Sequence, residues 1–441
     1  MSGIWVALAV FLFTYFLISI RRLPRIKLDR PIAALVGAVL MLILGVVTPE
    51  RALESIDLDI LFLLLGMMLL VVGLEFCGLF EWVSIRMIRY SGTQFRLLLL
   101  VMVVSAVLSA LVLNDAVVLM FTPIVIKTCR LVKTDPVPFL VGEVVAANIG
   151  SVATAVGNPQ NAYIATKAGI GFLEFSAALL PVAVVSLLIG VALIYIIFRK
   201  DIEKGDAAAL RSLALANGWS RLRNFILEGD SQAKEGMVNL RNRRRALQAI
   251  LLITLIAVLG FSLSSFIGIP LFMVAFAAGV AAFLVLLLMT DVRSGEVLRK
   301  VDWSIILFFV GLFIVLQGVR DSGLLVEIQA LFPGFGPGET PTLGSLTLFS
   351  AVLSNLVSNV PAVMLLGEMI PIQSTDLWLA LASSSTLAGN ATLLGAAANI
   401  IVAEKAESMG VEVSFKRFVK AGLPIAIMTL LVSTLLLLVI L

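Results

Sequence analysis

The stretch LVLNDAVVLM (residues 111–120) places an asparagine and an aspartate in the middle of an apolar run, and LVSNVPAVML (residues 356–365) repeats the pattern with a second asparagine. Asn114 and Asn359 lie 245 positions apart, counted from 114 to 359. Polar groups inside a bilayer are costly because they find no water there. Two matching interruptions therefore predict paired places at which the chain turns at membrane depth.

The composition supports a membrane protein. The chain has 441 residues, of which 60% are hydrophobic and 14% are charged, with a mean hydropathy of +1.10. Soluble domains average about 45–50% apolar and about 25% charged residues. Apolar runs of roughly 20 residues, enough to cross a hydrocarbon core of about 30 Å, recur along the whole length. The sequence therefore predicts an all-α polytopic membrane protein, in which the first run, 4–20, is a retained span rather than a signal peptide.

Several activities are excluded by residues that are missing. The chain contains no histidine and two cysteines, which supply neither a disulfide framework nor a set of metal ligands. It also lacks a phosphate-binding GxxxxGK[ST] loop, which an ATP-driven pump needs. An intramembrane enzyme would require a nucleophile beside a base, or metal ligands. We therefore expect no catalytic residues, no enzyme activity and no cofactor.

The basic residues predict how the chain enters the membrane. Segment 96–130 begins and ends beside basic clusters, and the positive-inside rule places both of its ends in the cytoplasm. It is long enough for two half-length helices, so we expect a re-entrant hairpin with Asn114 and Asp115 at its tip. Segment 343–372 has few basic residues at either end and predicts a hairpin from the outward side. Both chain termini are expected outside, and the basic loop 199–246 is expected to be a cytoplasmic linker.

The two halves of the chain resemble each other. Asp57 matches Asp302 and Gly66 matches Gly311 at the same separation of 245 that relates the two asparagines. Further on, GSVATAVGNPQN from Gly150 matches AGNATLLGAAAN from Ala388 at a separation of 238. We therefore expect a first repeat over 1–198 and a second over 247–441. Each has five transmembrane helices plus one hairpin, and the odd number inverts the second copy, as in secondary transporters.

The broken segments are the predicted binding site. Asn114 and Asn359 suit the N-cap of each returning half-helix, and Asn158 suits the cap of a helix that starts at Pro159 after a permissive glycine, Gly157. Helix N-termini favour an anion, whereas amide, hydroxyl and carbonyl oxygens favour a hard cation such as Na⁺. The candidate substrate- and ion-binding residues are Asn114, Asp115, Ser151, Thr154, Gly157, Asn158, Asn161, Ser358, Asn359, Thr392, Gly395 and Asn399. A Na⁺ ion is expected at Asn114, Asp115 and Asn359.

Asp115 has two readings. Its counterpart in the second half is Val360, so the fold does not require an acid at this position. The carboxylate either stabilises the first turn of a half-helix through the helix dipole, or binds the coupling cation or a proton.

At these residues the chain resembles a known group. SNVPAVMLL, NIGSVATAVGNPQN and LNDAVVLMFTPIVI resemble the citrate-transporter-like members of the ion transporter superfamily, which include divalent-anion/sodium symporters, arsenite permeases and some Na⁺/H⁺ antiporters. The resemblance covers nearly the whole chain apart from the central loop. It implies two scaffold regions, two hairpins, elevator-like transport and a homodimer.

The hairpin tips differ from those of the carboxylate symporters, which carry a Ser-Asn-Thr triplet at both tips. Here the tips read Leu113-Asn114-Asp115 and Ser358-Asn359-Val360, so two hydroxyls are missing at the first tip and one at the second. This argues against a dicarboxylate, and the Asn-Asp tip is more similar to the arsenite permeases. We expect a secondary transporter of a small inorganic or organic anion in the cytoplasmic membrane, coupled to Na⁺ or H⁺. The alternatives are Na⁺/H⁺ exchange, arsenite efflux and, more remotely, a channel.

Overall fold

The computed structural model describes residues 2–19, 29–205, 240–336 and 339–441, and the regular structure over these ranges is α-helical. The helices of the first half are α1 (Ser2–Ser19), α2 (Arg30–Ile43), α3 (Pro49–Ser55), α4 (Leu58–Phe76), α5 (Leu79–Ser91), α6 (Gln94–Leu111), α7 (Asn114–Leu131), α8 (Pro136–Val152), α9 (Pro159–Ala168) and α10 (Phe172–Ile202). Those of the second half are α14 (Leu240–Ile267), α15 (Leu271–Met289), α16 (Ser294–Lys300), α17 (Trp303–Asp321), α18 (Leu324–Leu331), α19 (Leu343–Val357), α20 (Asn359–Gly367), α21 (Thr375–Ala388), α22 (Ala397–Ser408) and α23 (Phe415–Ile440). Most of the basic linker, 206–239, lies outside the described residues.

Seven described helices are long and apolar enough to cross a membrane, which agrees with a polytopic membrane protein. They are α4, α6, α10, residues 242–267 of α14, α15, α17 and α23. Four of the apolar segments read from the sequence are divided into two helices each. Segment 96–130 forms α6 and α7, 137–170 forms α8 and α9, 343–372 forms α19 and α20, and 376–403 forms α21 and α22. The helix breaks expected at these places are confirmed.

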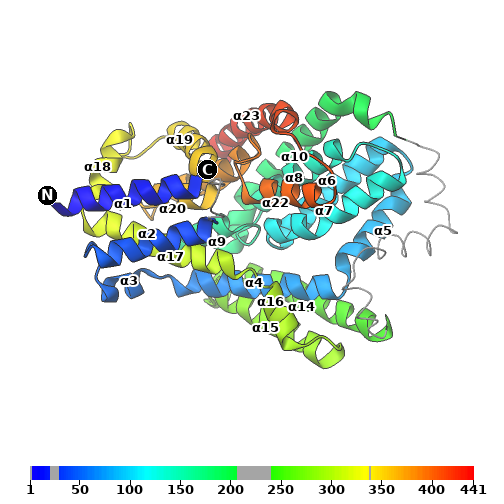
Figure 1. The fold of residues 1–441 in the computed structure, drawn as a ribbon, viewed down its shortest axis with the longest axis horizontal. Coiled ribbons are helices and arrows are strands. Elements are labelled where there is room, and N and C mark those ends of the chain that lie inside the picture. Colours follow the sequence, from blue (N-terminus) through cyan, green and yellow to red (C-terminus); the bar gives the residue numbers. More distant parts are fainter. Residues whose placement is uncertain (1, 20–28, 206–239, 337–338) are drawn as a thin grey trace.

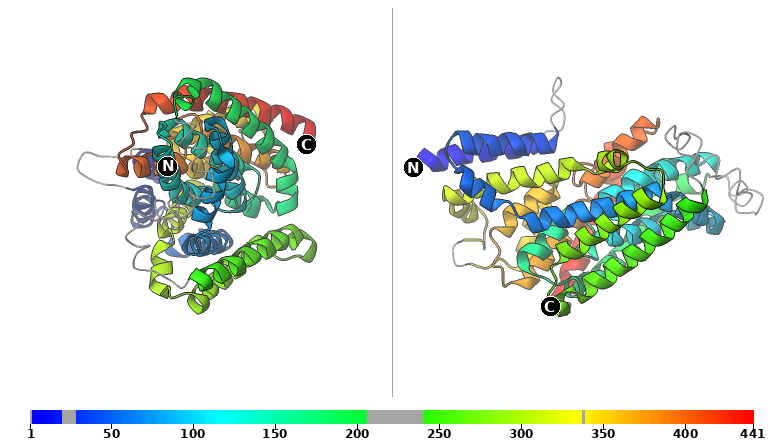
Figure 2. Two further views of the ribbon diagram at one scale, coloured as in Figure 1. Left: turned by 90° about the vertical axis from the view of Figure 1, so that its right-hand side faces the viewer. Right: turned by 90° about the horizontal axis from the view of Figure 1, so that it is seen from below.

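The helices form two groups (Figure 1, Figure 2). In the first, which we call the frame, α4 packs against α15, α17 against α2, α1 against α2, and α14 against α15. In the second, the hairpin group, α6 and α10 pack against α8, α19 against α21, and α10 against α23. Each half of the chain therefore contributes helices to both groups, and the frame joins α4 of one half to α15 of the other.

Two glycines explain the close packing in the frame. A Cβ added at Gly66 of α4 would lie 2.4 Å from the backbone of Ala275 in α15, and one at Gly311 of α17 would lie 2.7 Å from the backbone of Ala34 in α2. These glycines are the pair that the sequence matched at a separation of 245. Each therefore permits backbone-to-backbone contact with the partner helix, as small residues do between membrane helices.

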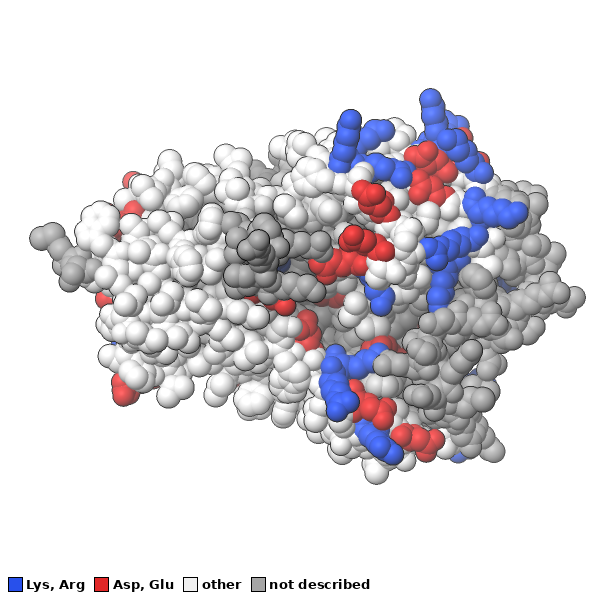
Figure 3. All heavy atoms as spheres, viewed as in Figure 1, with Lys and Arg blue, Asp and Glu red and all other residues white. Residues whose placement is uncertain are grey.

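Charged side chains are unevenly distributed along the molecule. Figure 3 shows Lys and Arg gathered on the half of this face that includes α5 and α10, whereas the other half, around α1 and α18, is largely without them. The hairpin arms α6 and α7 lie toward the first of these ends, and α19 and α20 lie toward the second (Figure 1). The tips of both hairpins meet between the ends.

Candidate functional site

The first hairpin tip is formed by two extended residues between α6 and α7. Helix α6 ends at Leu111, and α7 begins at Asn114 itself. The expectation that Asn114 caps its helix is therefore wrong by one residue: Leu113 occupies the N-cap position and makes no side-chain cap. The reason is a competing bond, because the Asn114 backbone N–H donates to the Gly157 carbonyl at 2.9 Å. The tip of the hairpin is thus joined directly to the break between α8 and α9.

The second tip is tighter and strained. Helix α20 begins at Asn359, so here too the asparagine lies inside the helix, and Ser358 occupies the N-cap position without a capping bond. Ser358 has φ 81° and ψ 162°, a region that residues other than glycine occupy at a cost of about 1–3 kcal/mol. Its counterpart Leu113 has an unstrained φ of −56°. The two tips match in sequence but differ in backbone conformation.

The Asn359 side chain joins the second tip to both broken segments. Its amide orientation, assigned from the hydrogen-bond network, lets the nitrogen donate to the carbonyls of Gly395 (3.0 Å) and Ser385 (3.1 Å) and the oxygen accept from Gln160 Nε2 (3.3 Å). Pro361 lies in the first turn of α20, as expected, where its missing N–H costs little.

The break between α8 and α9 has most of the features that were expected from the sequence. Asn158 caps α9 by accepting from the Asn161 N–H at 2.8 Å, and Pro159 is the first helical residue. Asn161 Nδ2 donates back across the break to the carbonyls of Ser151 (2.9 Å) and Thr154 (3.1 Å). These bonds satisfy carbonyls that the interrupted helix leaves without partners.

The same bonds recur in the second half of the chain. Asn399 Nδ2 donates to the carbonyls of Gly389 (2.7 Å) and Thr392 (2.8 Å), each 238 positions beyond the corresponding group around Asn161. The same pattern of hydrogen bonds therefore stabilises both helix breaks.

Gly157 has a different role from the one expected. It is not among the glycines with positive φ, so a special dihedral angle is not the reason for glycine here. A Cβ at Gly157 would instead lie 2.5 Å from the Ser151 carbonyl oxygen and 2.9 Å from the Ser109 carbonyl oxygen. Glycine is needed because the backbones of three segments approach one another.

We expect Gly157→Ala to lower the stability of the folded protein by about 1–3 kcal/mol, because both clashing atoms belong to backbone that cannot rotate away. Thermal unfolding in detergent measures the effect. The control is Gly344→Ala in α19, where an added Cβ meets nothing within 4 Å and should be neutral or slightly stabilising. Equal unfolding temperatures for both variants would contradict the close approach.

Asn148 of α8 connects all these elements, and it was not predicted from the sequence. Its Nδ2 donates to Oδ1 of Asn390 and of Asn399, both at 3.0 Å, and its Oδ1 accepts from Asn114 Nδ2 at 3.2 Å. The side chain is fully buried. One asparagine therefore joins a hairpin tip of the first half to the broken segment of the second.

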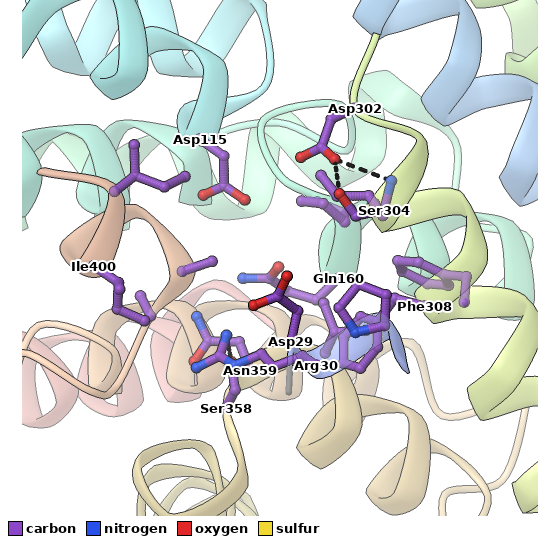
Figure 4. A pocket seen from close by; sticks show the side chains of 18 of the residues that line it. Asp29, Arg30, Asp115, Gln160, Asp302, Ser304, Phe308, Ser358, Asn359 and Ile400 are labelled. Carbon is purple, nitrogen blue, oxygen red and sulfur yellow. Dashed lines mark hydrogen bonds between the residues drawn. The ribbon is translucent and has the colours of Figure 1, made fainter. Parts of the chain in front are cut away.

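A pocket of about 280 Å³ lies where both tips, α9 and α22 meet the first turns of α2 and α17 (Figure 4). Of the predicted site residues, four line it: Asn114, Asp115, Ser358 and Asn359. The other eight do not line it and instead belong to the two breaks behind its wall. These are Ser151, Thr154, Gly157, Asn158, Asn161, Thr392, Gly395 and Asn399.

The pocket also contains charged residues that were not predicted from the sequence. Asp29 and Arg30 come from the start of α2, Asp302 caps α17, and Glu404 comes from α22. With Asp115, the described residues that line the pocket include four acidic side chains and one guanidinium. The sequence signals were that Asp29 and Asp302 each stand just before an apolar run and that Asp302 matches Asp57 of the first half. In the described part of the chain, no three acidic or cysteine side chains converge as metal ligands.

Comparison with known proteins gives a consistent family. A family model described as "Citrate transporter" matches residues 13–378. The chain is 31% identical over 441 residues to the "46 kDa membrane protein" of Mycobacterium leprae, covering 96% of both chains. It is 29% identical over 446 residues to "Silicon efflux transporter LSI3" of Oryza sativa subsp. japonica, covering 91% of this chain and 90% of the relative.

A solved structure has a similar fold. The YdaH transporter of Alcanivorax borkumensis superposes with a TM-score of 0.50 at 17% identity, covering 99% of this chain and 97% of the other. At this identity the similarity concerns the fold alone.

Proposed function

Because the chain belongs to the citrate transporter family, we propose that it is a secondary active transporter that moves a small anion across the cytoplasmic membrane together with Na⁺ or H⁺. The family consists of membrane transporters rather than enzymes. The finer parts of the proposal, namely the anion, the coupling ion and the mechanism, rest on the pocket.

The observation that carries the proposal is the convergence of both hairpin tips and both broken segments on one pocket. Helices α7, α9, α20 and α22 all begin there, and the N-termini of helices carry a partial positive charge that favours an anion. Asp115 provides the opposite charge for a cation. Oxygens of Asn114, Asp115 and Asn359 are the proposed ligands of Na⁺, which prefers hard oxygen donors.

The proposed mechanism is elevator-like movement of the hairpin group against the frame. It is supported by the contacts within each group, and by the matched hydrogen bonds at Asn161 and Asn399, which fit two inverted repeats over 1–198 and 247–441. In this arrangement 96–130 enters from the cytoplasm and 343–372 from outside. A homodimer in the bilayer is the proposed assembly.

The topology predicts which residues a membrane-impermeant maleimide reaches. Tyr90 and Lys133, exposed at the two ends of the first hairpin, should be labelled as single cysteines only after the membrane is permeabilised. Glu54→Cys, exposed in the last turn of α3, should be labelled in intact cells. The background replaces Cys77 and Cys129. If Lys133→Cys is labelled in intact cells and Tyr90→Cys is not, then 96–130 crosses the membrane completely and the two repeats are not inverted.

A second candidate is an uncharged oxyacid. Among the described residues that line the pocket, Asp29, Asp115 and Asp302 accompany the single guanidinium of Arg30, which favours a cation or a neutral solute over a free anion, and a relative is named as a silicon efflux transporter. Arsenite efflux fits the same charge balance, and Na⁺/H⁺ exchange would use the carboxylates alone. In both anion and oxyacid transport, Asp115 holds the accompanying cation or proton.

A panel of solutes separates these candidates. Purified protein is heated with citrate, succinate, sulfate, phosphate, arsenite, silicic acid or Li⁺, with and without Na⁺, because a ligand of the folded state raises the unfolding temperature. Stabilisation by an anion that depends on Na⁺ or on low pH supports the first proposal. Stabilisation by arsenite or silicic acid supports the second. A response to Na⁺ or Li⁺ alone supports cation exchange.

A further inference from the structure

Arg30 is the cationic side chain among the described residues that line the pocket, and it belongs to the frame. Its Nη1 donates to Ser358 Oγ at 2.9 Å, although the two residues come from opposite halves of the chain. Figure 4 shows Arg30, Ser358 and Asn359 together on one wall of the pocket. A guanidinium has five N–H donors, so others besides this one are available to a solute.

The strained backbone of Ser358 is explained by this bond. Ser358 makes no cap for α20, so its hydroxyl is not used in the way that a serine at this position normally is. A positive φ moves the side chain to a direction that an ordinary backbone would not allow. In this conformation the hydroxyl accepts from Arg30. The counterpart Leu113 has neither the strain nor such a bond.

Two other frame residues hold the same short helix. The Tyr15 hydroxyl of α1 donates to the Pro361 carbonyl at 3.1 Å in a buried position. Arg320 of α17 lies 3.1 Å from Glu368, which follows the last residue of α20 and is 10% exposed. Helix α20 has nine residues and is about 13 Å long. The frame contacts it just before its first residue, at Ser358, in its first turn, at Pro361, and just after its last residue, at Glu368.

A second cavity, of about 800 Å³, lies further along α20, beside Met364 and Glu368. It is lined by Arg51, Gln317, Arg320, Met364 and Glu368, among others, at the end of the molecule where α3 and α18 lie (Figure 1). In the proposed topology this end faces the outside. Helix α20 runs from the pocket, at its N-terminus, to the second cavity, at Met364 and Glu368, and α9 and α17 run alongside it between the same two cavities.

We propose that Arg30 is a solute-binding residue that also keeps α20 closed, and that it releases Ser358 when its guanidinium binds an oxygen of the transported anion. The bond to Ser358 and the bond to the solute use the same group, so each weakens the other. Once the bond is released, the strain at Ser358 favours movement of α20 away from the frame. The pocket then communicates with the second cavity only after solute has bound. This rests on the proposed anion transport.

The experiment follows labelling of a cysteine at Met364, which is 1% exposed and lines the second cavity. Citrate and sulfate are the probes, in a background without other cysteines. In the wild-type sequence we expect slow labelling that either probe accelerates. Arg30→Gln and Ser358→Ala each remove the bond, so both should be labelled about tenfold faster or more without any probe, the factor that one charge-assisted hydrogen bond represents.

Affinity should distinguish the two variants. Arg30→Gln loses a solute contact, so the probe that stabilises the wild type should bind at least about tenfold more weakly. Ser358→Ala removes the competitor for the guanidinium, so the same probe should bind more tightly. Arg30→Lys keeps the positive charge but loses the planar, paired N–H donors of the guanidinium, so its affinity for the probe should lie between those of the wild type and Arg30→Gln. The matched control is Arg51→Gln, an arginine that lines the second cavity and pairs with Asp321 rather than with α20.

The outcomes separate this inference from the proposed function. If neither probe stabilises the wild type, the transported solute is neither citrate nor sulfate, but the labelling rates without solute still test whether the Arg30–Ser358 bond holds α20. If a probe stabilises the wild type and binds equally well to Arg30→Gln, Arg30 does not bind the solute. If labelling at Met364 is the same in the wild type, Arg30→Gln and Ser358→Ala, Arg30 does not hold α20.

Discussion

Asp115→Asn is expected to stop accumulation of solute against a concentration gradient while exchange between equal concentrations partly survives. The substitution keeps the size of the side chain and one of its acceptor oxygens but removes its charge. A carboxylate near the centre of a membrane costs at least about 2.5–3.5 kcal/mol, and the matched Val360 shows that the fold does not need it. Asp115 is half-buried and lines both the pocket and a smaller adjoining cavity of about 70 Å³.

The measurement is uptake of the stabilising solute into proteoliposomes under an imposed Na⁺ or proton gradient. We expect gradient-driven uptake to fall by about tenfold or more, the factor that corresponds to about 1.4 kcal/mol. The matched control is Asp29→Asn, which removes an exposed carboxylate from the same pocket at a position that makes no capping bond. If Asp115→Asn accumulates solute like the wild type, with unchanged dependence on Na⁺ and pH, then Asp115 only stabilises the start of α7.

Asn148→Leu is expected to destabilise the protein more than any other single substitution at the two breaks. Leucine has a similarly branched, somewhat larger side chain, and it leaves Asn114 Nδ2 and the Oδ1 atoms of Asn390 and Asn399 without their bonds to this residue. Each buried polar group without a partner costs about 1–3 kcal/mol, so the sum should be at least about 3 kcal/mol. Because the bonds join the two halves of the chain, transport should be lost as well.

The comparison is Ser433→Ala, which removes a single buried hydrogen bond of 3.0 Å to Ser383, away from the pocket. That variant should lose about 1 kcal/mol and retain transport. Thermal unfolding in detergent and uptake into proteoliposomes measure the two effects. Equal stability of Asn148→Leu and Ser433→Ala would show that the asparagine network does not hold the two breaks together.

The sequence predicted the helix breaks well because their causes are local. An asparagine, glycine or proline within an apolar run disturbs the backbone wherever the run is placed, and an asparagine followed by a proline, as at Asn158 and Pro159, is typical of a helix start. The exact residue at which each helix begins was harder to predict. Asn114 and Asn359 were expected as caps, but each is the first residue of its helix. The Asn114 N–H bonds to Gly157, 43 positions away in the chain, and no local rule anticipates such a partner.

The role of a polar residue at a break was also not readable from the sequence. Of the predicted site residues, Asn161 and Asn399 bond backbone carbonyls across the breaks, whereas Asn114 and Asn359 line the pocket. The same residue type serves both purposes, and only its position relative to the pocket distinguishes them. Arg30 was not among the predicted site residues, because its partner Ser358 lies in the other half of the chain.

By itself, the sequence determined the membrane class, the four interrupted segments, the internal repeat and the acid at the first tip, because each depends on composition or on spacing within one segment. Only the tertiary structure decided which polar residues face the pocket, that Asn148 joins the two breaks, that Gly157 serves close packing, and that Arg30 reaches Ser358. These features depend on contacts between segments that are distant along the chain. Such contacts follow from the packing of whole helices, and the separation of residues in the sequence carries little information about them.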